Sequence, residues 1–520
     1  MNLNKQLGST CTGIHCYQTE QYDTEFTRMC PDFDIYPTII PHQNRVIAIG
    51  DIHGDMNLAI NFLKAGQVIE EVVEPDKLFK QHIKERVYRL KISKLNNNIS
   101  GLNVEDNDKT YNQTVDHKKN QFDVVYRYYK INNEYYVKIV QEDNNPKYKN
   151  TQCTENCDFT RWFKWIGGQT HVVQVGDQVD RCRPFDGYSC KDNITINDED
   201  SDLEIMLFYD SLDKIAKKKG GRVFSLLGNH EIMNVMGDMR YVSHKGVKEY
   251  SPEPKDYANG YQIRTNTFES VIAQKMACTR STILVIGDYL FVHGGIAHKL
   301  AYNYKLIDVN LIVRKFLHGS LKHNNDLKTI LNSSRYSPLW YRRLAYIPPD
   351  TTNSGGKPHA DCKQIYEPIV NKINEMNFSK QSQQTRQQQS QQTQPHHSRS
   401  NKYQQIQSQP SDFTKLTKSI SNSLLLTSTN SETISTEPTI QIKGMVIGHT
   451  PQFTVFNQGI TTACSNRIVR TDIGGSTAFD HFARETNNPA IAQARIPQVM
   501  EIITNLQTKE SSMRVMFYSK

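Results

Sequence analysis

The sequence predicts an α/β protein whose short, buried strands end in polar turns. Five apolar, β-prone segments are each followed by a turn that carries Asp, Asn or His. In α/β proteins, ligand and catalytic groups gather outside the carboxyl ends of the strands. We therefore expect the five turns to form one site. The five segments are Arg45–Ile49, His171–Val175, Arg222–Leu227, Ile283–Val292 and Met445–Ile447.

The first unit is a strand, a polar turn and a helix in direct succession. Arg45–Ile49 ends in the turn GDIHGD, which carries Asp51 and His53. Residues 56–64 follow with a mixed helical pattern of apolar side chains, and Asp55 is a candidate N-cap. This succession is the βα unit that an α/β fold requires.

A long insertion separates the first unit from the second. Asp177, in the second turn, lies 177 − 51 = 126 positions after Asp51, several times what one βα unit needs. We assign the excess to an insertion at residues 78–165 that is rich in Lys, Asn and Tyr. Within it, Phe122–Lys130 and Tyr135–Val140 predict a β-hairpin.

The predicted hairpin carries aromatic and basic side chains that a nucleic acid or a phosphopeptide could contact. A hairpin packed on the main domain, with one solvated face, explains the same pattern, and we favour it. The formal net charge of +8 over 520 residues is modest. We therefore expect no nucleic-acid partner, while the insertions leave room for partner proteins.

The middle of the chain continues the alternation of helix, strand and polar turn. Asp202–Lys218 has apolar side chains three and four positions apart and lysines in its last turn, which predicts a helix. The strand Arg222–Leu227 then delivers the turn GNHE. The polar side chains in the turns GDQVDR and GNHE are Asp177, Asp180, Arg181, Asn229, His230 and Glu231.

Two histidines follow the remaining strands. Ile283–Val292 has the pattern of a hairpin and ends in His293, and Met445–Ile447 ends in His449. After them we expect a hairpin in TVFNQGITTACSN and two final strands in PQVMEIIT and MRVMFYS. Residues 378–440, before the last of the five turns, are rich in Gln, Ser and Thr, which predicts a disordered insertion.

The chain ends and the cysteines give weaker signals. Residues 1–40 predict an irregular extension before a discontinuous domain at 41–520. No apolar run approaches the ~20 residues of a membrane span, and the amino terminus lacks a signal pattern, so we expect no membrane association and a cytoplasmic location. Ten cysteines favour free thiols over a disulfide scaffold. A zinc cluster is the alternative for Cys153, Cys157, Cys182 and Cys190, although their spacing is irregular.

The polar residues at the strand ends suit a pair of metal ions. A carboxylate can bridge two ions, Asn offers its side-chain oxygen, and imidazole is a common ligand. Mn, Fe and Zn all accept such ligands, so the residues leave the metal open. The candidate ligands are Asp51, His53, Asp177, Asn229, His293 and His449.

The motifs GDIHGD, GDQVDR, GNHE, HGG and GHT, in this order, resemble those of the calcineurin-like metallophosphoesterases of the phosphoprotein phosphatase superfamily. GNHEIMNVMGDMRYV, FVHGG and SPLWYR narrow the resemblance to the Shewanella-like, bacterial-type protein phosphatases. The resemblance covers roughly residues 40–75, 168–345 and 443–520. It implies a calcineurin-like β-sandwich flanked by helices.

The resemblance also implies the metal ligands and the proton donor. Asp51 and His53 hold one ion, and Asp177 bridges to a second ion. His230 protonates the leaving oxygen, and Asp180 orients its ring. The remaining ligands of the second ion are Asn229, His293 and His449.

The resemblance implies that arginines and one side-chain amide bind the phosphate. By the resemblance, Arg181 and Asn229 hold the phosphoryl group. Arg342 in SPLWYR is a second candidate, and Arg343 and Arg240 are its alternatives. Cys182 stands where the superfamily usually has glycine. We expect a thiol exposed beside the metals there, whose oxidation would inactivate the site.

The implied activity is that of a dinuclear-metal-dependent protein phosphatase. It would hydrolyse phosphomonoesters of Ser and Thr, or of Tyr, in phosphoprotein substrates by direct attack of a hydroxide held between the metals. Two alternatives stay open. One is a dinucleoside-polyphosphate hydrolase or other phosphoesterase on the same fold, and the other is a non-catalytic binding module.

Overall fold

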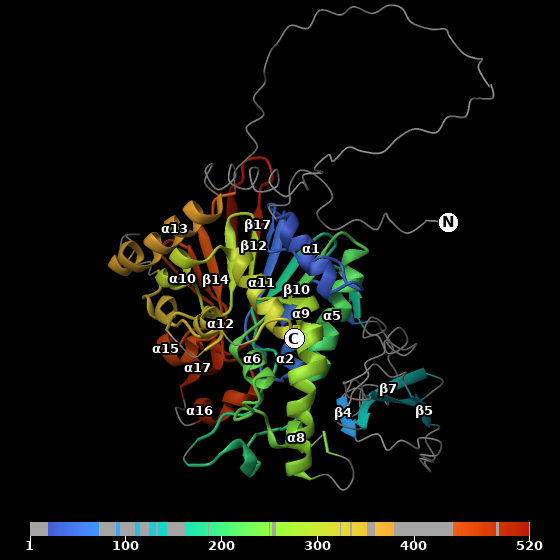
Figure 1. Cartoon of the computed structure of the whole chain (residues 1–520). Helices are drawn as coiled ribbons and strands as arrows, with labels where there is room; N and C mark the ends of the chain where they lie inside the picture. The colour runs from blue at the N-terminus through green and yellow to red at the C-terminus, as the bar shows by residue number, and fades with distance from the viewer. Residues whose placement is uncertain are drawn as a thin grey trace, which may run out of the picture. The chain divides into compact units, whose positions relative to one another are not determined.

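The computed structural model describes residues 19–71, 163–378 and 440–518 apart from short gaps at 186, 249, 252–255, 323, 333–334, 351–358 and 485–487, and the backbone of four strands between residues 90 and 142. Two six-stranded mixed sheets form the body (Figure 1). One hydrophobic core contains side chains from both sheets, among them Ile47, Val172, Leu284 and Val446. The predicted α/β sandwich is therefore confirmed.

One sheet has the order β11-β10-β9-β2-β17-β18. Its centre is parallel, because β9 (His171–Gln174) pairs with β2 (Arg45–Ile49) on one side and with β10 (Arg222–Leu226) on the other. Parallel neighbours end at the same edge, so the three polar turns that follow them lie side by side. The remaining strands are β11 (Arg280–Ser281), β17 (Gln498–Thr504) and β18 (Ser511–Phe517), of which the last two are the predicted final strands and pair antiparallel.

The other sheet has the order β1-β12-β13-β14-β16-β15. β12 (Ile283–Ile286) and β13 (Tyr289–Val292) form the predicted hairpin, and β14 (Gly444–Ile447) runs parallel to β13. His293 and His449 therefore leave this sheet at one edge. The outer strands are β1 (Ile39–Ile40), β15 (Thr461–Ala463) and β16 (Ile468–Arg470).

A hairpin was expected within TVFNQGITTACSN, and the prediction is wrong for the first half of this segment. The segment begins at the end of α15 (Gln452–Phe456), and the hairpin is instead formed by β15 and β16. Cys464, Ser465 and Asn466 join these strands with φ values of 58°, 59° and 62°. Three consecutive left-handed residues reverse the chain without a glycine, and Asn466 is the residue type among them that best tolerates this conformation.

Helices cover both flanks of the sheets, with α10 and α13 on one flank and α1 and α5 on the other (Figure 1). The two predicted helices are confirmed as α2 (Met56–Ala65) and α5 (Asp202–Lys217). Asp55 is the N-cap of α2, because its side chain accepts a hydrogen bond from the Leu58 amide at 3.0 Å. The others are α6 (Asn229–Val235), α7 (His244–Lys248), α8 (Tyr257–Thr267), α9 (Ala273–Thr279), α10 (His298–Asn303), α11 (Leu306–Leu317), α12 (Asn325–Leu331), α13 (Glu367–Phe378), α16 (Asp480–Arg484) and α17 (Pro489–Ala494). Single 3₁₀ or π turns lie at Cys190–Asp192, Phe268–Ile272, Arg343–Tyr346, Cys362–Tyr366 and Thr477–Phe479.

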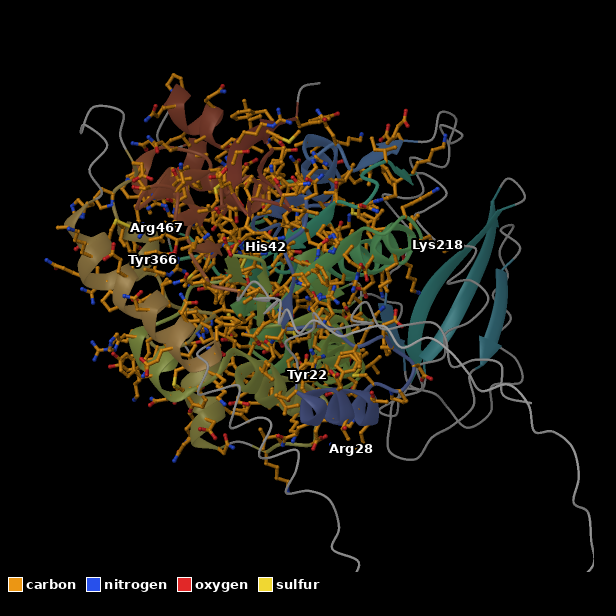
Figure 2. The ribbon with its side chains drawn as sticks, turned by 90° about the horizontal axis from the view of Figure 1, so that it is seen from above. Tyr22, Arg28, His42, Lys218, Tyr366 and Arg467 are labelled. Carbon is orange, nitrogen blue, oxygen red and sulfur yellow. A yellow bond between two sulfur atoms is a disulfide. The ribbon has the colours of Figure 1, made fainter. Side chains whose placement is uncertain are left out.

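The described part of the 1–40 extension is not irregular. Residues Glu20–Met29 form α1, which buries Tyr22 in the core and turns Arg28 outward (Figure 2). The Tyr22 hydroxyl donates to the carbonyl of Tyr36 at 2.8 Å and accepts from Arg314 at 3.1 Å. The helix therefore packs in the same hydrophobic core as the two sheets, although it precedes the domain start expected at residue 41.

The insertion between the first two units emerges from a small two-stranded sheet. β3 (Ile69–Glu71) and β8 (Phe163–Trp165) pair antiparallel on either side of it. The predicted hairpin is confirmed as β6 (Val124–Ile131) and β7 (Glu134–Glu142), which β4 (Leu90–Ser93) and β5 (Thr110–Thr114) extend to four strands. Its side-chain surface lies outside the described residues, as does nearly all of the predicted disordered insertion, at 379–439. Within the part of the chain that is described, no helix combines the length and the apolar character needed to cross a membrane.

The free-thiol expectation is wrong for all six cysteines that the structure describes. Each is in a disulfide: Cys30–Cys278, Cys182–Cys190 and Cys362–Cys464. Cys182 therefore offers neither a free thiol nor a zinc ligand, and Cys153 and Cys157 lie outside the described residues. Disulfides persist in oxidising compartments, so these pairs do not favour the cytoplasmic location expected from the sequence.

We expect protein purified without reductant to contain these three disulfides and to lose stability when they are reduced. The Cys30–Cys278 and Cys362–Cys464 bonds span 248 and 102 positions, and closing long loops restricts the unfolded chain. Each is expected to contribute about 2–4 kcal/mol to the free energy of unfolding. Non-reducing peptide mapping and melting curves with and without reductant measure this. Free thiols at these positions in the folded protein would contradict the pairing.

Candidate metal centre

The polar turns of both sheets meet at one place. The backbone amide of His449, after β14, donates to the Asp51 carboxylate, after β2, at 3.0 Å. The Asp177 carboxylate, after β9, accepts a hydrogen bond from the His230 amide, after β10, at 3.0 Å. The sequence placed these residues on separate turns, and the structure brings them together in one buried cluster.

Four residues of the cluster have a left-handed backbone. The φ values are 47° for His53, 55° for Asp177, 73° for Asp180 and 68° for His449. Non-glycine residues rarely adopt this region, and such residues often lie at functional sites. These conformations turn four side chains back toward the strand ends, where the other candidate ligands lie.

Two glycines allow the turns to approach this closely. A Cβ atom on Gly228 would lie 2.1 Å from Asp177 Oδ1, and one on Gly448 would lie 2.2 Å from Asp51 Oδ1. Neither carboxylate could stay in place beside a side chain. Gly228 thus allows two turns of one sheet to approach each other, and Gly448 allows the turn after β14 to approach Asp51 of the other sheet.

The Asp177 carboxylate lies at the middle of the cluster. Its Oδ2 atom is 3.1 Å from His293 Nε2, 3.8 Å from His230 Nε2 and 3.9 Å from His53 Nε2. Two groups with metal-ligand spacing share this aspartate. They are His53–Asp177–His230 and Asp177–His293–His449.

The remaining candidate ligands complete both groups. His293 Nε2 is 2.9 Å from Asn229 Oδ1 and 3.1 Å from His449 Nδ1. On the other side, His53 Nε2 is 3.7 Å from Asp51 Oδ2. All six predicted ligands are therefore neighbours.

Backbone carbonyls orient two of the imidazoles. His53 Nδ1 donates to the carbonyl of Val179 at 3.2 Å, and His293 Nδ1 donates to that of Val175 at 3.0 Å. Each bond places a proton on Nδ1 and directs Nε2 toward Asp177, so Nε2 is the atom that would bind a metal ion.

The donor set fits divalent cations, because the cluster has buried negative charge and orphaned polar atoms. Burial, and then the charges of Asp472 and Asp177, raise the pKa of Asp51 well above its usual range. Burial raises the pKa of Asp472 to about 6. His449 Nε2 and Asp472 Oδ2 are buried without a hydrogen-bond partner among the described residues. A cation would neutralise these carboxylates.

Asp472 is a site residue that the ligand motifs missed. It lies two residues after the end of β16, so its strand-end position was its only signal. Burial also lowers the pKa of His53 and His449 well below the usual value, so both rings are neutral, as metal binding requires.

His230 has the partner that the sequence predicted. Its Nδ1 donates to Asp180 Oδ2 at 2.7 Å, which leaves Nε2 facing the cluster. Asp180 is held in turn, because its Oδ1 accepts from Asn234 at 2.8 Å and its amide donates to Asp202 at 3.1 Å. Buried Arg264 donates to both Asn234 and Asp202, which closes this network.

Glu231 braces the loops of the site through their backbone amides. Its carboxylate accepts the amides of Gly228 at 2.7 Å, Asp177 at 3.0 Å and Gln178 at 2.7 Å. The turns after β9 and β10 are thereby tied together.

Arg181 and Arg342, the two arginines expected to bind phosphate, have different hydrogen-bond partners. Arg181 is buried, donates to the carbonyls of Gly54 and Asn197, and forms an ion pair with Glu199 at 2.5 Å. Its polar contacts thus go to neighbouring loops and not to the cluster. Arg342 donates to the carbonyl of His449 at 2.8 Å and to Thr450 Oγ1 at 3.1 Å, which places it beside a candidate ligand.

Fold and site together define an α/β sandwich with a candidate two-metal centre at its strand ends. Residues 157–366 match the family model of the calcineurin-like phosphoesterases. The chain thus contains a calcineurin-like metallophosphoesterase domain, as the motifs predicted. Asp51, His53 and His449 lie outside the matched range, and the fold brings them to the three ligands inside it.

Several individual proteins are also similar to this chain. The chain is 38% identical over 164 residues to an uncharacterized protein of Acanthamoeba polyphaga mimivirus, covering 28% of this chain and 65% of that protein. It is 29% identical over 215 residues to the Shewanella-like protein phosphatase 2 of Arabidopsis thaliana, covering 34% and 48%. The matches thus span about half to two thirds of these relatives. The cold-active protein-tyrosine phosphatase of a Shewanella species superimposes over 93% of this chain and 83% of its own, with a TM-score of 0.40 and 15% identity.

Proposed function

We propose that the protein is a phosphoprotein phosphatase that hydrolyses phosphomonoesters with the help of two divalent metal ions. The observation that carries the proposal is the position of Asp177 Oδ2, which two buried ligand groups share. A shared carboxylate is the expected link in a two-metal site. Similarity to proteins named as protein phosphatases supports phosphoproteins as substrates.

Six side chains would hold the metals. Asp51, His53 and Asp177 form one group, and Asp177 also joins the second group, which is completed by Asn229, His293 and His449. When bound, two such ions supply Lewis acidity toward phosphoryl oxygens and lower the pKa of water. Mn, Fe and Zn all suit these ligands.

The chain's own residues would direct the proton and the substrate. His230, whose Nδ1 is held by Asp180, would donate the Nε2 proton to the leaving oxygen. Asp180 keeps the ring in the required tautomer and stabilises its positive charge. Asn229 and Arg342 remain candidates for contact with the phosphoryl group.

Phosphate release by purified protein with Mn²⁺ tests the proposal. The substrates are matched pSer, pThr and pTyr peptides and a dinucleoside polyphosphate, and metal content is measured in the same sample. Release from peptides supports the phosphatase and gives its amino-acid preference. Cleavage of the dinucleotide alone would instead assign the chain to another phosphoesterase class, and two bound ions without turnover would favour a binding module.

A further inference from the structure

A second arginine, Arg183, lies two residues after Arg181 on the turn that follows β9. Its Nη1 donates to the carbonyls of Asp180 at 3.0 Å and Cys182 at 2.7 Å, which folds the side chain back along its own turn. The Cys182 amide donates to the carbonyl of Tyr241 at 3.0 Å, and Cys182 is bonded to Cys190. The backbone that carries Arg183 is therefore held on both sides.

Two aromatic rings hold the guanidinium beside the metal centre. The Arg183 guanidinium carbon is 4.7 Å from the centre of the Phe479 ring and 5.4 Å from that of Tyr241. Phe479 packs edge-on against His53 at 5.5 Å, and Tyr241 packs against His230 at 5.0 Å, between ring centres. The rings that hold Arg183 are thus the ones that contact a metal ligand and the proposed proton donor.

Arg183 forms no ion pair among the described residues. No carboxylate lies within ion-pair distance of its guanidinium in the described chain, whereas Arg181 pairs with Glu199 at 2.5 Å. Arg183 is half-buried, and burial lowers its pKa. A half-buried cation without a partner is costly unless a ligand supplies one.

Arg183 also keeps donors available for a ligand. Among the described residues, no hydrogen bond uses its Nε or Nη2, so these atoms can form a fork for two oxygens. Arg342 approaches the centre from the other sheet, through His449. The two arginines thus contact different sides of the cluster, Arg342 at His449 and Arg183 at the rings beside His53 and His230.

We propose that Arg183, and not Arg181, binds the phosphoryl group of the substrate, held in place by Tyr241 and Phe479. The inference rests on the proposed phosphatase function, and it transfers the phosphate-binding role from the motif arginine to one outside the motif. Arg181 instead joins the turn after β2 to the loop that carries Glu199.

Arg183→Met and Arg183→Lys test this role. Met keeps an unbranched apolar chain against the two rings but removes the charge and the fork, and Lys keeps the charge alone. The control is Arg335→Met, because Arg335 is exposed and lies over the ring of Tyr336 at 5.3 Å. Measurements are the melting temperature, Mn content, calorimetric binding of inorganic phosphate to Mn-loaded protein, and kcat/KM on a phosphopeptide.

We expect Arg183→Met to keep its Mn content and melting temperature. Its phosphate affinity should fall at least tenfold, and kcat/KM should fall by on the order of 10²–10³-fold, the usual cost of losing an anion-stabilising donor. The phosphate affinity and kcat/KM of Arg183→Lys should lie between those of wild type and Arg183→Met. Arg335→Met should match wild type in both quantities. If Arg183→Met does not fold, the phosphate affinity of folded Arg183→Lys tests the role of Arg183 instead. We expect this affinity to be lower than that of wild type.

Two results would overturn this role. One is a phosphate affinity of Arg183→Met within threefold of wild type, and the other is an equal loss in Arg335→Met. Failure of the proposed function looks different, because wild type itself would then release no phosphate from any peptide. Phosphate binding that depends on Arg183 in an inactive wild type would support this inference and reject the phosphatase.

Discussion

Asp177→Asn is expected to lower kcat by on the order of 10³-fold or more and to reduce the bound metal below two ions per chain. The Asp177 Oδ2 atom is shared by both ligand groups, so its negative charge serves both ions. Losing several kcal/mol of charge stabilisation has this effect, because about 1.4 kcal/mol corresponds to a tenfold change in rate. Elemental analysis and phosphate release measure the two effects.

Asn is the suitable replacement because it preserves the local structure. Asp177 has a φ of 55°, and Asn tolerates this left-handed conformation. Its side-chain oxygen can still accept the His230 amide, which Asp177 Oδ1 accepts at 3.0 Å. Asp256→Asn is the control, since Asp256 caps α8 and Asn caps helices equally well. Full metal content with kcat within tenfold of wild type would contradict the central role of Asp177.

The sequence predicted the parts of the site that depend on local patterns. Each candidate ligand lies in the turn after a buried strand, so the prediction of the strands also indicated which polar residues would come together. The turn after β2 and the helix α2 with its Asp55 cap are an example. Parallel pairing of β9 with β2 and β10 then brings separate turns to one edge without any further signal.

Partners that are distant in the sequence were not predictable in this way. Arg181 was expected at the phosphate because of its motif, but it pairs with Glu199 from a polar loop that has no pattern of its own. Cys30 and Cys278 are 248 positions apart, and nothing near either residue indicates the other. Helix α1 was missed because its first residues are charged and polar, although Tyr22 and Phe26 are fully buried.

The environment of Arg183 also depends on residues that are distant in the sequence. The sequence alone offers an arginine after a cysteine, with no reason to prefer it over Arg181. Its environment is assembled from three segments: its own turn, Tyr241 after α6, and Phe479 after β16. Only the folded chain brings these rings to His230 and His53, so the role of Arg183 could be inferred only from the structure.

His230→Asn is expected to lower kcat on phosphopeptides by about 10²–10⁴-fold, the usual contribution of a general acid. His230 Nδ1 is held by Asp180 at 2.7 Å, so Nε2 is the atom that carries the transferable proton when the ring is charged. Its Nε2 also lies 3.8 Å from Asp177 Oδ2, which makes a metal-ligand role the competing explanation. A proton donor can be lost without loss of metal, whereas a ligand cannot.

The leaving group separates these two roles of His230. An aryl phosphate with a strongly acidic leaving group needs no proton, so His230→Asn should affect it far less than an alkyl phosphate. Asp180→Asn should also lower kcat more on the alkyl phosphate than on the aryl phosphate. The losses from Asp180→Asn and His230→Asn should not be additive, because both residues take part in the transfer of the same proton. Equal losses on both substrates, together with reduced metal content, would instead make His230 a ligand. The proton would then have to come from elsewhere in the site, because His230 is the histidine of the cluster that is paired with a carboxylate through Nδ1.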